Sequence, residues 1–185
     1  EPQISDRYAI FGYSMGALLG YEIGRRWVRW GLPGPETFFV LACNAPDRML
    51  IDREPFHTMD DSDFRQALLD LGGIQTEILD NSEAMALFEP VLRNDFRICE
   101  TYRHGNEKGR LTCGAHVFVA DDDEFVQWEQ AQAWSEFVAG KLAMHRLDGR
   151  HMVDGQTFAA LRATIESLWL KSTTTSRHGD MEYSV

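Results

Sequence analysis

Cysteine is scarce in this chain of 185 residues, and its spacing matches no metal site. Cys43, Cys99 and Cys113 are odd in number and far apart, whereas disulfide frameworks and zinc sites use paired cysteines at short intervals. None of the three lies in a recognisable turn that would present a catalytic nucleophile. We therefore expect three reduced thiols in or near the core, as in cytoplasmic proteins, and no metal.

Positive charge is also in short supply. Lysine and arginine total 18 against 29 acidic residues, which gives a net charge of −11. Such a chain is repelled by nucleic-acid phosphates and by anionic membranes, so neither is expected as a partner. No apolar run is long enough to span a bilayer, and the first residues have neither the basic start nor the apolar stretch of a signal peptide. We expect a cytoplasmic location.

What the chain does contain is typical of one globular domain. Its hydrophobic content of 44% and its length allow a sizeable core. Apolar runs of strand length alternate with amphipathic helical patterns, which predicts an α/β fold with a mostly parallel sheet flanked by helices. The expected strands are 8–11, 37–43, 115–120 and 143–147, and the expected helices are 15–30, 127–138 and 157–170.

Between the second and third expected strands the pattern becomes entirely helical. We predict helices over 62–71, 81–88 and 90–102, the last two separated at Phe88 to Pro90. The length of this segment favours a lid over a site, about residues 56–104, rather than an ordinary helical crossover. The domain then covers residues 1–171, and the polar, unpatterned tail 172–185 is expected to be disordered.

The most informative motif is Gly12-Tyr13-Ser14-Met15-Gly16, at the junction of the first strand and the first helix. A Gly-x-Ser-x-Gly pentapeptide in that position is typical of the nucleophile elbow of α/β-hydrolases. Both glycines are expected to let the strained turn close without a Cβ clash. The backbone N–H of Met15, at the helix N-terminus, would face a developing oxyanion. The alternative is a glycine-rich turn with an incidental serine.

A serine nucleophile needs an imidazole to take its proton and a carboxylate to orient that imidazole. The order along an α/β-hydrolase chain is serine, acid, histidine. Here Ser14 is followed by the acidic run 121–123 at the end of one strand and by His151 after the last. Because the carboxyl ends of parallel strands share one edge of the sheet, these residues are expected to converge there.

The histidine and the acid each have competitors. His151 lies in a loop after the final strand, whereas the other histidines lie in strands, in or beside the lid, or in the tail: His116, His145, His57, His104 and His178. For His116 and His145 we expect structural roles. Asp123 is preferred to Asp121 as the acid, and Asp122 is expected to face solvent; a solvated acidic turn is the alternative for the run.

The segments Phe11–Ala17 and Gly20-Tyr21-Glu22 closely resemble the elbow of type II thioesterases, the stand-alone editing hydrolases of polyketide and nonribosomal peptide pathways. The resemblance covers roughly residues 5–170. It continues through Leu71-Gly72-Gly73, Leu92–Phe96, Glu100-Thr101-Tyr102, Val119–Asp123 and Gly149–Val153.

The resemblance implies an α/β-hydrolase fold and a serine thioesterase that removes acyl or aminoacyl groups from the phosphopantetheine arm of a carrier protein. Ser14 would be the nucleophile, His151 the base and Asp123 the residue that orients it. The arm belongs to the substrate, so no cofactor or metal is implied. The alternatives are a general carboxylesterase or lipase with the same triad, and a non-catalytic hydrolase fragment that binds a carrier.

The chain also departs from that family. Tyr13 stands where histidine is usual, and Ala120 and Arg150 stand where glycine is common. Family members have several strands and a loop before the elbow, and that loop supplies a second oxyanion amide. Only about seven residues precede the first strand here. We expect the N-terminal strands to be missing from a truncated or partial copy, or the open edge to pair with another copy.

Overall fold

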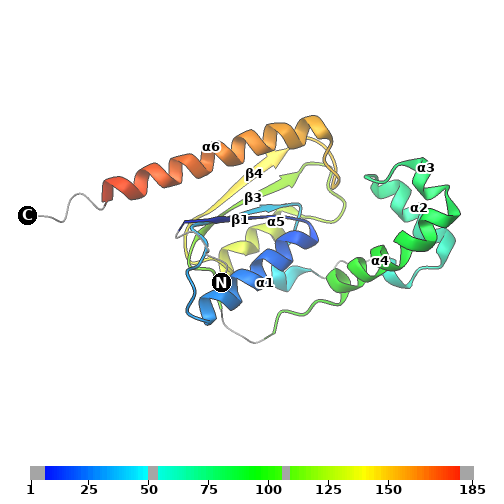
Figure 1. Ribbon diagram of the computed structural model, residues 1–185, viewed down its shortest axis with the longest axis horizontal. Helices are drawn as coiled ribbons and strands as arrows, with labels where there is room; N and C mark the ends of the chain where they lie inside the picture. Colours follow the sequence, from blue (N-terminus) through cyan, green and yellow to red (C-terminus); the bar gives the residue numbers. More distant parts are fainter. Residues whose placement is uncertain (1–6, 50–53, 106–108, 180–185) are drawn as a thin grey trace, which may run out of the picture.

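The sheet is parallel and has four strands in the part of the chain that the structure describes. In this computed structural model, the described residues are 7–49, 54–105 and 109–179. The strands are β1 (Ala9–Tyr13), β2 (Thr37–Leu41), β3 (Gly114–Ala120) and β4 (Leu142–Leu147), in the order β1-β2-β3-β4. All three neighbouring pairs are parallel, and Gly12 pairs with Val40 and Val40 with Val117. The predicted α/β class is confirmed (Figure 1).

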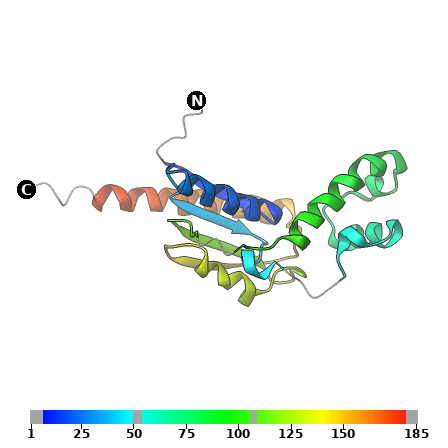
Figure 2. The same cartoon turned by 90° about the horizontal axis from the view of Figure 1, so that it is seen from below.

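Helices cover both faces of this sheet. α1 (Met15–Arg29), α5 (Trp128–Gln132) and a 3₁₀ turn (Ala133–Glu136) lie on one face, and α6 (Gly155–Gly179) lies on the other (Figure 2). Successive side chains of a strand point to opposite faces. Accordingly, Phe38 and Val40 pack in the cluster with α1, and Phe39 and Leu41 pack in the cluster with α6. This explains why β2 is apolar and buried at nearly every position.

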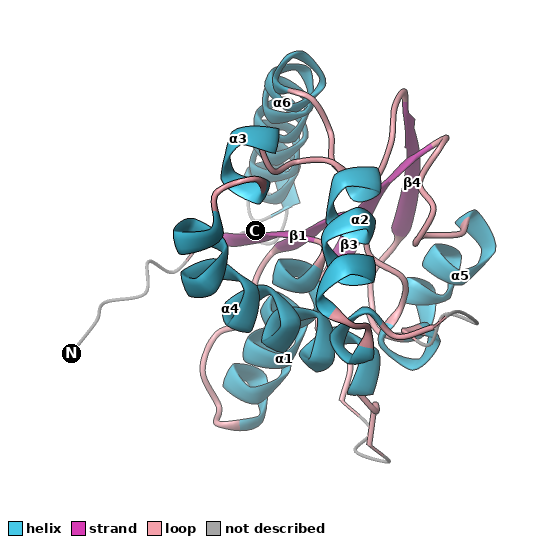
Figure 3. Ribbon diagram, turned by 90° about the vertical axis from the view of Figure 1, so that its right-hand side faces the viewer, coloured by secondary structure: helices cyan, strands magenta, loops and turns pink. Residues whose placement is uncertain are grey.

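The segment between β2 and β3 forms a separate helical unit, the helical insertion (residues 56–101). After a 3₁₀ turn at Pro46–Arg48, it consists of a 3₁₀ turn at Phe56–Thr58, α2 (Asp61–Leu71), α3 (Thr76–Leu79) and α4 (Ser82–Thr101). It has its own apolar cluster, centred on Phe64, Leu68 and Met85. Figure 3 shows the insertion in front of the strand ends, so it lies beyond the carboxyl edge of the sheet.

The predicted break between helices 81–88 and 90–102 is wrong, because α4 runs continuously through Pro90. Proline removes one backbone N–H from a helix interior, and the sequence predicted that a new helix begins at Pro90. The start of α4 is capped by Asn81, whose side-chain oxygen accepts hydrogen bonds from Glu83 N and Ala84 N at 3.0 Å. On the far side, Arg93 bridges the proline by donating to Glu89 at 2.9 Å.

The helices that follow β3 and β4 also differ from prediction in their lengths. The helix predicted over 127–138 is the short α5 followed by a 3₁₀ turn. The backbone of α6 runs from Gly155 to Gly179, so this helix ends later than the predicted helix 157–170. Extending a formed helix avoids the cost of nucleation, and no proline interrupts this stretch. Residues 180–185 of the predicted tail lie outside the described residues.

The cysteines behave as expected, since Cys43, Cys99 and Cys113 are free and two of them are buried. Within the described residues, we find no helix with the length and apolar character needed to cross a membrane.

The junction between β1 and α1 is a tight turn centred on Ser14. Ser14 has a φ of 50°, in the left-handed region, and its N–H donates to Leu41 O at 2.8 Å. A Cβ atom on Gly12 would lie 2.2 Å from Ala17 Cα, so only glycine fits there. A Cβ atom on Gly16 would meet no described atom within 4 Å apart from its chain neighbours and the backbone of its own helix. The expected need for glycine is therefore confirmed at position 12 and wrong at position 16.

These two glycines provide a matched pair of variants. Gly12→Ala should lower the free energy of unfolding by about 3 kcal/mol or more, because the clash is with backbone that has no rotamer to change. Gly16→Ala should change it by less than about 1 kcal/mol. Urea unfolding followed by circular dichroism measures both. Equal losses in the two variants would contradict the described turn.

Candidate active site

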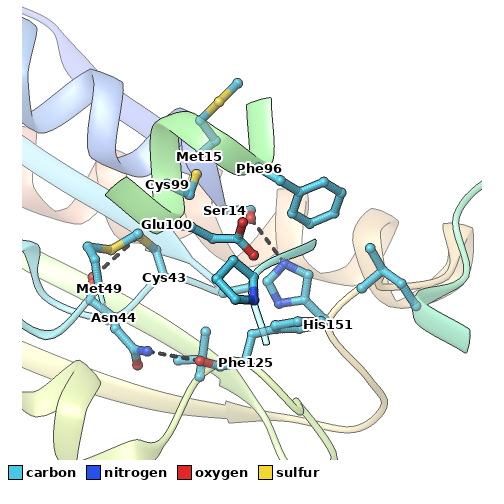
Figure 4. Close-up of a pocket in the computed structure, with 14 residues that line it drawn as sticks. Ser14, Met15, Cys43, Asn44, Met49, Phe96, Cys99, Glu100, Phe125 and His151 are labelled. Atoms are coloured by element: carbon cyan, nitrogen blue, oxygen red, sulfur yellow. Dashed lines mark hydrogen bonds between the residues drawn. The ribbon is translucent and has the colours of Figure 1, made fainter. Parts of the chain in front are cut away.

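Ser14 is presented at the carboxyl end of β1 by its strained backbone. A non-glycine residue in the left-handed region costs of order 1–3 kcal/mol, which the surrounding structure must offset. The turn places the Ser14 hydroxyl at the N-terminus of α1, next to Met15. Ser14 Oγ lies 3.0 Å from His151 Nε2 (Figure 4).

His151 lies in the loop between β4 and α6, the histidine loop (residues 148–154), and is 9% exposed. Its Nδ1 lies 3.0 Å from both carboxylate oxygens of Asp123. A carboxylate accepts hydrogen bonds, so Nδ1 carries a proton and Nε2 is left to accept from the Ser14 hydroxyl. The ring of Phe125 packs edge-on against the imidazole, with 4.9 Å between ring centroids.

Asp123 has a fully buried side chain at the end of β3. Its Oδ1 also accepts the backbone N–H groups of Phe125 at 2.8 Å and Val126 at 3.0 Å. A buried carboxylate requires such partners. Asp121, in contrast, is 45% exposed and forms an ion pair with Arg146. The structure therefore brings Asp123, and not Asp121, to His151.

A cavity of about 150 Å³ opens beside Ser14 and His151. Its wall is formed by α1 and the segments that follow β2 and β3, with Met15, Ala42, Cys43, Asn44, Met49, Phe125 and Val126. Pro55 and the helical insertion complete the wall with Leu71, Phe96, Cys99 and Glu100. Most of this wall is apolar. Ser14 and His151 thus line a mostly apolar cavity, and Asp123 contacts His151 from outside its wall.

Two polar residues of the cavity wall, Asn44 and Glu100, were not predicted as site residues from the sequence. Asn44 donates to Phe125 O at 2.8 Å and accepts from Gln127 N at 3.2 Å, which ties the end of β2 to the loop that carries Asp123. Glu100 accepts from Phe56 N and from His57 Nδ1, at 2.9 and 2.7 Å. Asn44 could have been found from the sequence, because it is a polar residue directly after the buried strand 37–43.

The thiols of the cavity wall are poorly suited to ionise. Burial raises the pKa of Cys99 to about 11 and raises that of Cys43 further. The thiolate is the nucleophilic form, so both remain unreactive at neutral pH.

Of the other histidines, His57 is bonded to Glu100 of the cavity wall, and His104, His116 and His145 do not line the cavity. His116 and His145 occupy β3 and β4, as predicted, with their rings stacked and 2.9 Å between Nδ1 and Nε2. Burial lowers the pKa of both, so the pair is neutral near pH 7. His104 packs against Phe137, and the side chain of His178 lies outside the described residues. Over the described ranges, His, Cys, Asp and Glu form no cluster of three suited to a metal ion.

Comparison with known proteins agrees with this architecture. The thioesterase domain family matches residues 2–168. Linear gramicidin dehydrogenase LgrE from Brevibacillus parabrevis is 31% identical over 171 residues, which cover 90% of this chain. RedJ, a thioesterase from the prodiginine pathway of Streptomyces coelicolor, is 33% identical with a TM-score of 0.77 over 86% of this chain. YbtT, a type II thioesterase from the yersiniabactin NRPS/PKS pathway, is 28% identical with a TM-score of 0.79 over 92%.

The chain spans less than two thirds of the curated relative named above, 64% of LgrE, and it spans 63% of RedJ and 69% of YbtT. The match nevertheless includes the sheet, the helical insertion and the Ser14 junction. The resemblance to type II thioesterases is thus confirmed, and the chain belongs to the thioesterase domain family.

Proposed function

We propose that this chain is a serine thioesterase that hydrolyses acyl or aminoacyl thioesters on the phosphopantetheine arm of carrier proteins. The observation that carries the proposal is the hydrogen-bonded series from Ser14 through His151 to Asp123, at the wall of an apolar cavity. Membership of the thioesterase family supports the thioester as the bond attacked. The names of RedJ and YbtT support a polyketide or nonribosomal peptide pathway.

The geometry suits two-step acyl transfer. His151 Nε2 accepts the Ser14 proton as Oγ attacks the thioester carbonyl, and Asp123 stabilises the imidazolium through Nδ1. The imidazolium then gives this proton to the departing sulfur, which leaves as the thiol of the arm. Water, activated by the same imidazole, cleaves the acyl-serine. The Met15 N–H, at the first turn of α1, is proposed as an oxyanion donor.

We propose a small acyl group as the part of the substrate that occupies the cavity. An apolar cavity of about 150 Å³ is large enough for a benzene-sized molecule. We propose that the helical insertion, within the lid predicted over residues 56–104, closes over this group, and that the hydrolase domain covers residues 1–171. The reaction needs no cofactor or metal from the protein. A cytoplasmic location is proposed with it, where carrier-bound intermediates are made.

Three alternatives to a thioesterase are an esterase, a non-catalytic fragment and a dehydrogenase. A general carboxylesterase or lipase would use the same trio but prefer oxygen esters to thioesters. A non-catalytic hydrolase fragment would bind a carrier without cleaving it. The third alternative, a dehydrogenase, comes from the name of the relative LgrE, and it would require a dinucleotide site. Dinucleotide sites of the Rossmann type place glycine at the middle of a Gly-x-Gly-x-x-Gly turn, whereas this turn holds Ser14 against His151, which favours hydrolysis.

Ser14→Ala should reduce kcat for a carrier-bound acyl thioester by roughly 10⁴-fold or more, because no other hydroxyl replaces the nucleophile. Liquid chromatography of the released acid measures the rate. Ser135→Ala, an exposed serine on the far side of the core, is the control. Turnover that survives Ser14→Ala would remove the serine mechanism, and a larger kcat/KM on the matched oxygen ester would favour the esterase.

Asp123→Asn and Asp121→Asn separate the two candidate acids. Asp123→Asn should lower kcat by about 10³–10⁴-fold, since an amide does not hold the imidazole in the required tautomer. Asp121→Asn should leave kcat within about threefold, because it removes only an exposed ion pair with Arg146. Steady-state kinetics on one thioester suffices. The reverse order of effects would assign the acid to Asp121.

The thiols of Cys43 and Cys99 in the cavity wall should take no part in the reaction. Cys99→Ala should keep kcat within about threefold of the parent value. If Cys99 were the nucleophile, the same substitution would abolish turnover. Because the pKa of Cys99 is raised to about 11, its alkylation by iodoacetamide should quicken roughly tenfold per pH unit between pH 7 and 10. Peptide mass spectrometry reports the rate at each cysteine. Fast, pH-independent alkylation at neutral pH would contradict the buried environment.

A further inference from the structure

Tyr13 connects the nucleophile strand to the loop that carries the histidine. Its hydroxyl donates to the backbone carbonyl oxygen of His151 at 2.7 Å. The oxygen of the Tyr13 hydroxyl in turn accepts a hydrogen bond from the N–H of Val153 at 3.0 Å. The phenol thus binds one acceptor and one donor of the histidine loop, 138 and 140 positions away in the sequence. Both halves of its hydrogen-bonding capacity are used.

The histidine loop has few other backbone anchors in the described part of the chain. It lies between β4 and α6 without regular structure, and Gly149 within it has a φ of 109°. Its carbonyl at Gly149 accepts from Asp122 N at 3.0 Å, which holds the start of the loop. The two hydrogen bonds of Tyr13 hold the middle, on either side of Met152. They fix the backbone from which the imidazole projects.

Tyr13 is suited to this task because its hydroxyl stays protonated at neutral pH. Partial burial raises its pKa, so the hydroxyl keeps its proton and remains a donor. Its ring also lies beside the imidazole, with 6.3 Å between the centroids. An ionised phenolate would lose the bond to the His151 carbonyl.

We propose that Tyr13 is a positioning residue that sets the distance between His151 and Ser14, through the backbone of the histidine loop rather than through the reacting atoms. This inference rests on the proposed hydrolase function. Small errors in the placement of a catalytic base are costly, since a displacement of about 1 Å lowers rates by up to about 10²-fold. The residue directly before the nucleophile thereby couples the position of Ser14 to that of His151.

Tyr13→Phe removes the hydroxyl and keeps the ring. It should lower kcat for a short acyl thioester by about 10- to 100-fold, with KM changed less than about twofold, because the base and not the acyl site is disturbed. Labelling of Ser14 by a fluorophosphonate should slow by the same factor. Tyr8→Phe is the matched control, since it removes one hydroxyl bond to Pro33 O, far from the site. It should leave both rates unchanged.

Folding is separated from positioning by assaying both variants well below their urea and thermal midpoints. Unchanged hydrolysis and labelling in Tyr13→Phe would overturn the proposal. So would a loss that disappears once the variant is cooled to full folding, because that loss reflects stability alone.

A spectroscopic readout keeps the proposal testable without turnover. If the parent chain neither hydrolyses thioesters nor reacts with the fluorophosphonate, the proposed function fails. The proton on His151 Nδ1, hydrogen-bonded to Asp123, should still give a downfield NMR signal in the parent. Tyr13→Phe should broaden or remove that signal and Tyr8→Phe should not. An identical signal in Tyr13→Phe would overturn the positioning role.

Discussion

The structure depends on one interaction across the carboxyl edge of the sheet, the hydrogen bond between Ser14 Oγ and His151 Nε2. β1 and β4 are not neighbours in the sheet, because β2 and β3 lie between them. The histidine loop must therefore reach over the ends of two strands to place its imidazole. Asp123, which follows β3, is hydrogen-bonded to the imidazole of His151. The Tyr13 hydroxyl, at the end of β1, donates to the backbone carbonyl of the same histidine. Parallel strands make this possible, since all their carboxyl ends face the same side.

Much of this arrangement could be predicted from the sequence, because the signals were local. Continuous apolar runs such as 37–43 predicted buried parallel strands, and the Gly-x-Ser-x-Gly junction predicted the turn at Ser14. The helix through Pro90 and the extension of α6 to Gly179 were not predictable in this way. There, continuation of an existing helix outweighed the local signals that favoured a break or an earlier end.

The choice between neighbouring aspartates shows where sequence reasoning ends. Asp121 and Asp123 share one loop and one chemistry, and strand periodicity does not say which carboxylate turns inward. In the structure, two backbone N–H groups from Phe125 and Val126 draw Asp123 into the interior, and Arg146 holds Asp121 at the surface. Asn44 acts on the same loop from the end of β2. Such support comes from contacts between distant segments, which a single sequence does not display.

The central claim is that the acyl group passes through Ser14. Its most direct test is intact-mass spectrometry of the chain, quenched shortly after mixing with a slowly released acyl thioester, followed by peptide mapping. The account predicts a transient mass increase of one acyl group, located on the peptide that contains Ser14. Hydrolysis without any adduct, or an adduct on the peptides of Cys43 or Cys99, would contradict it.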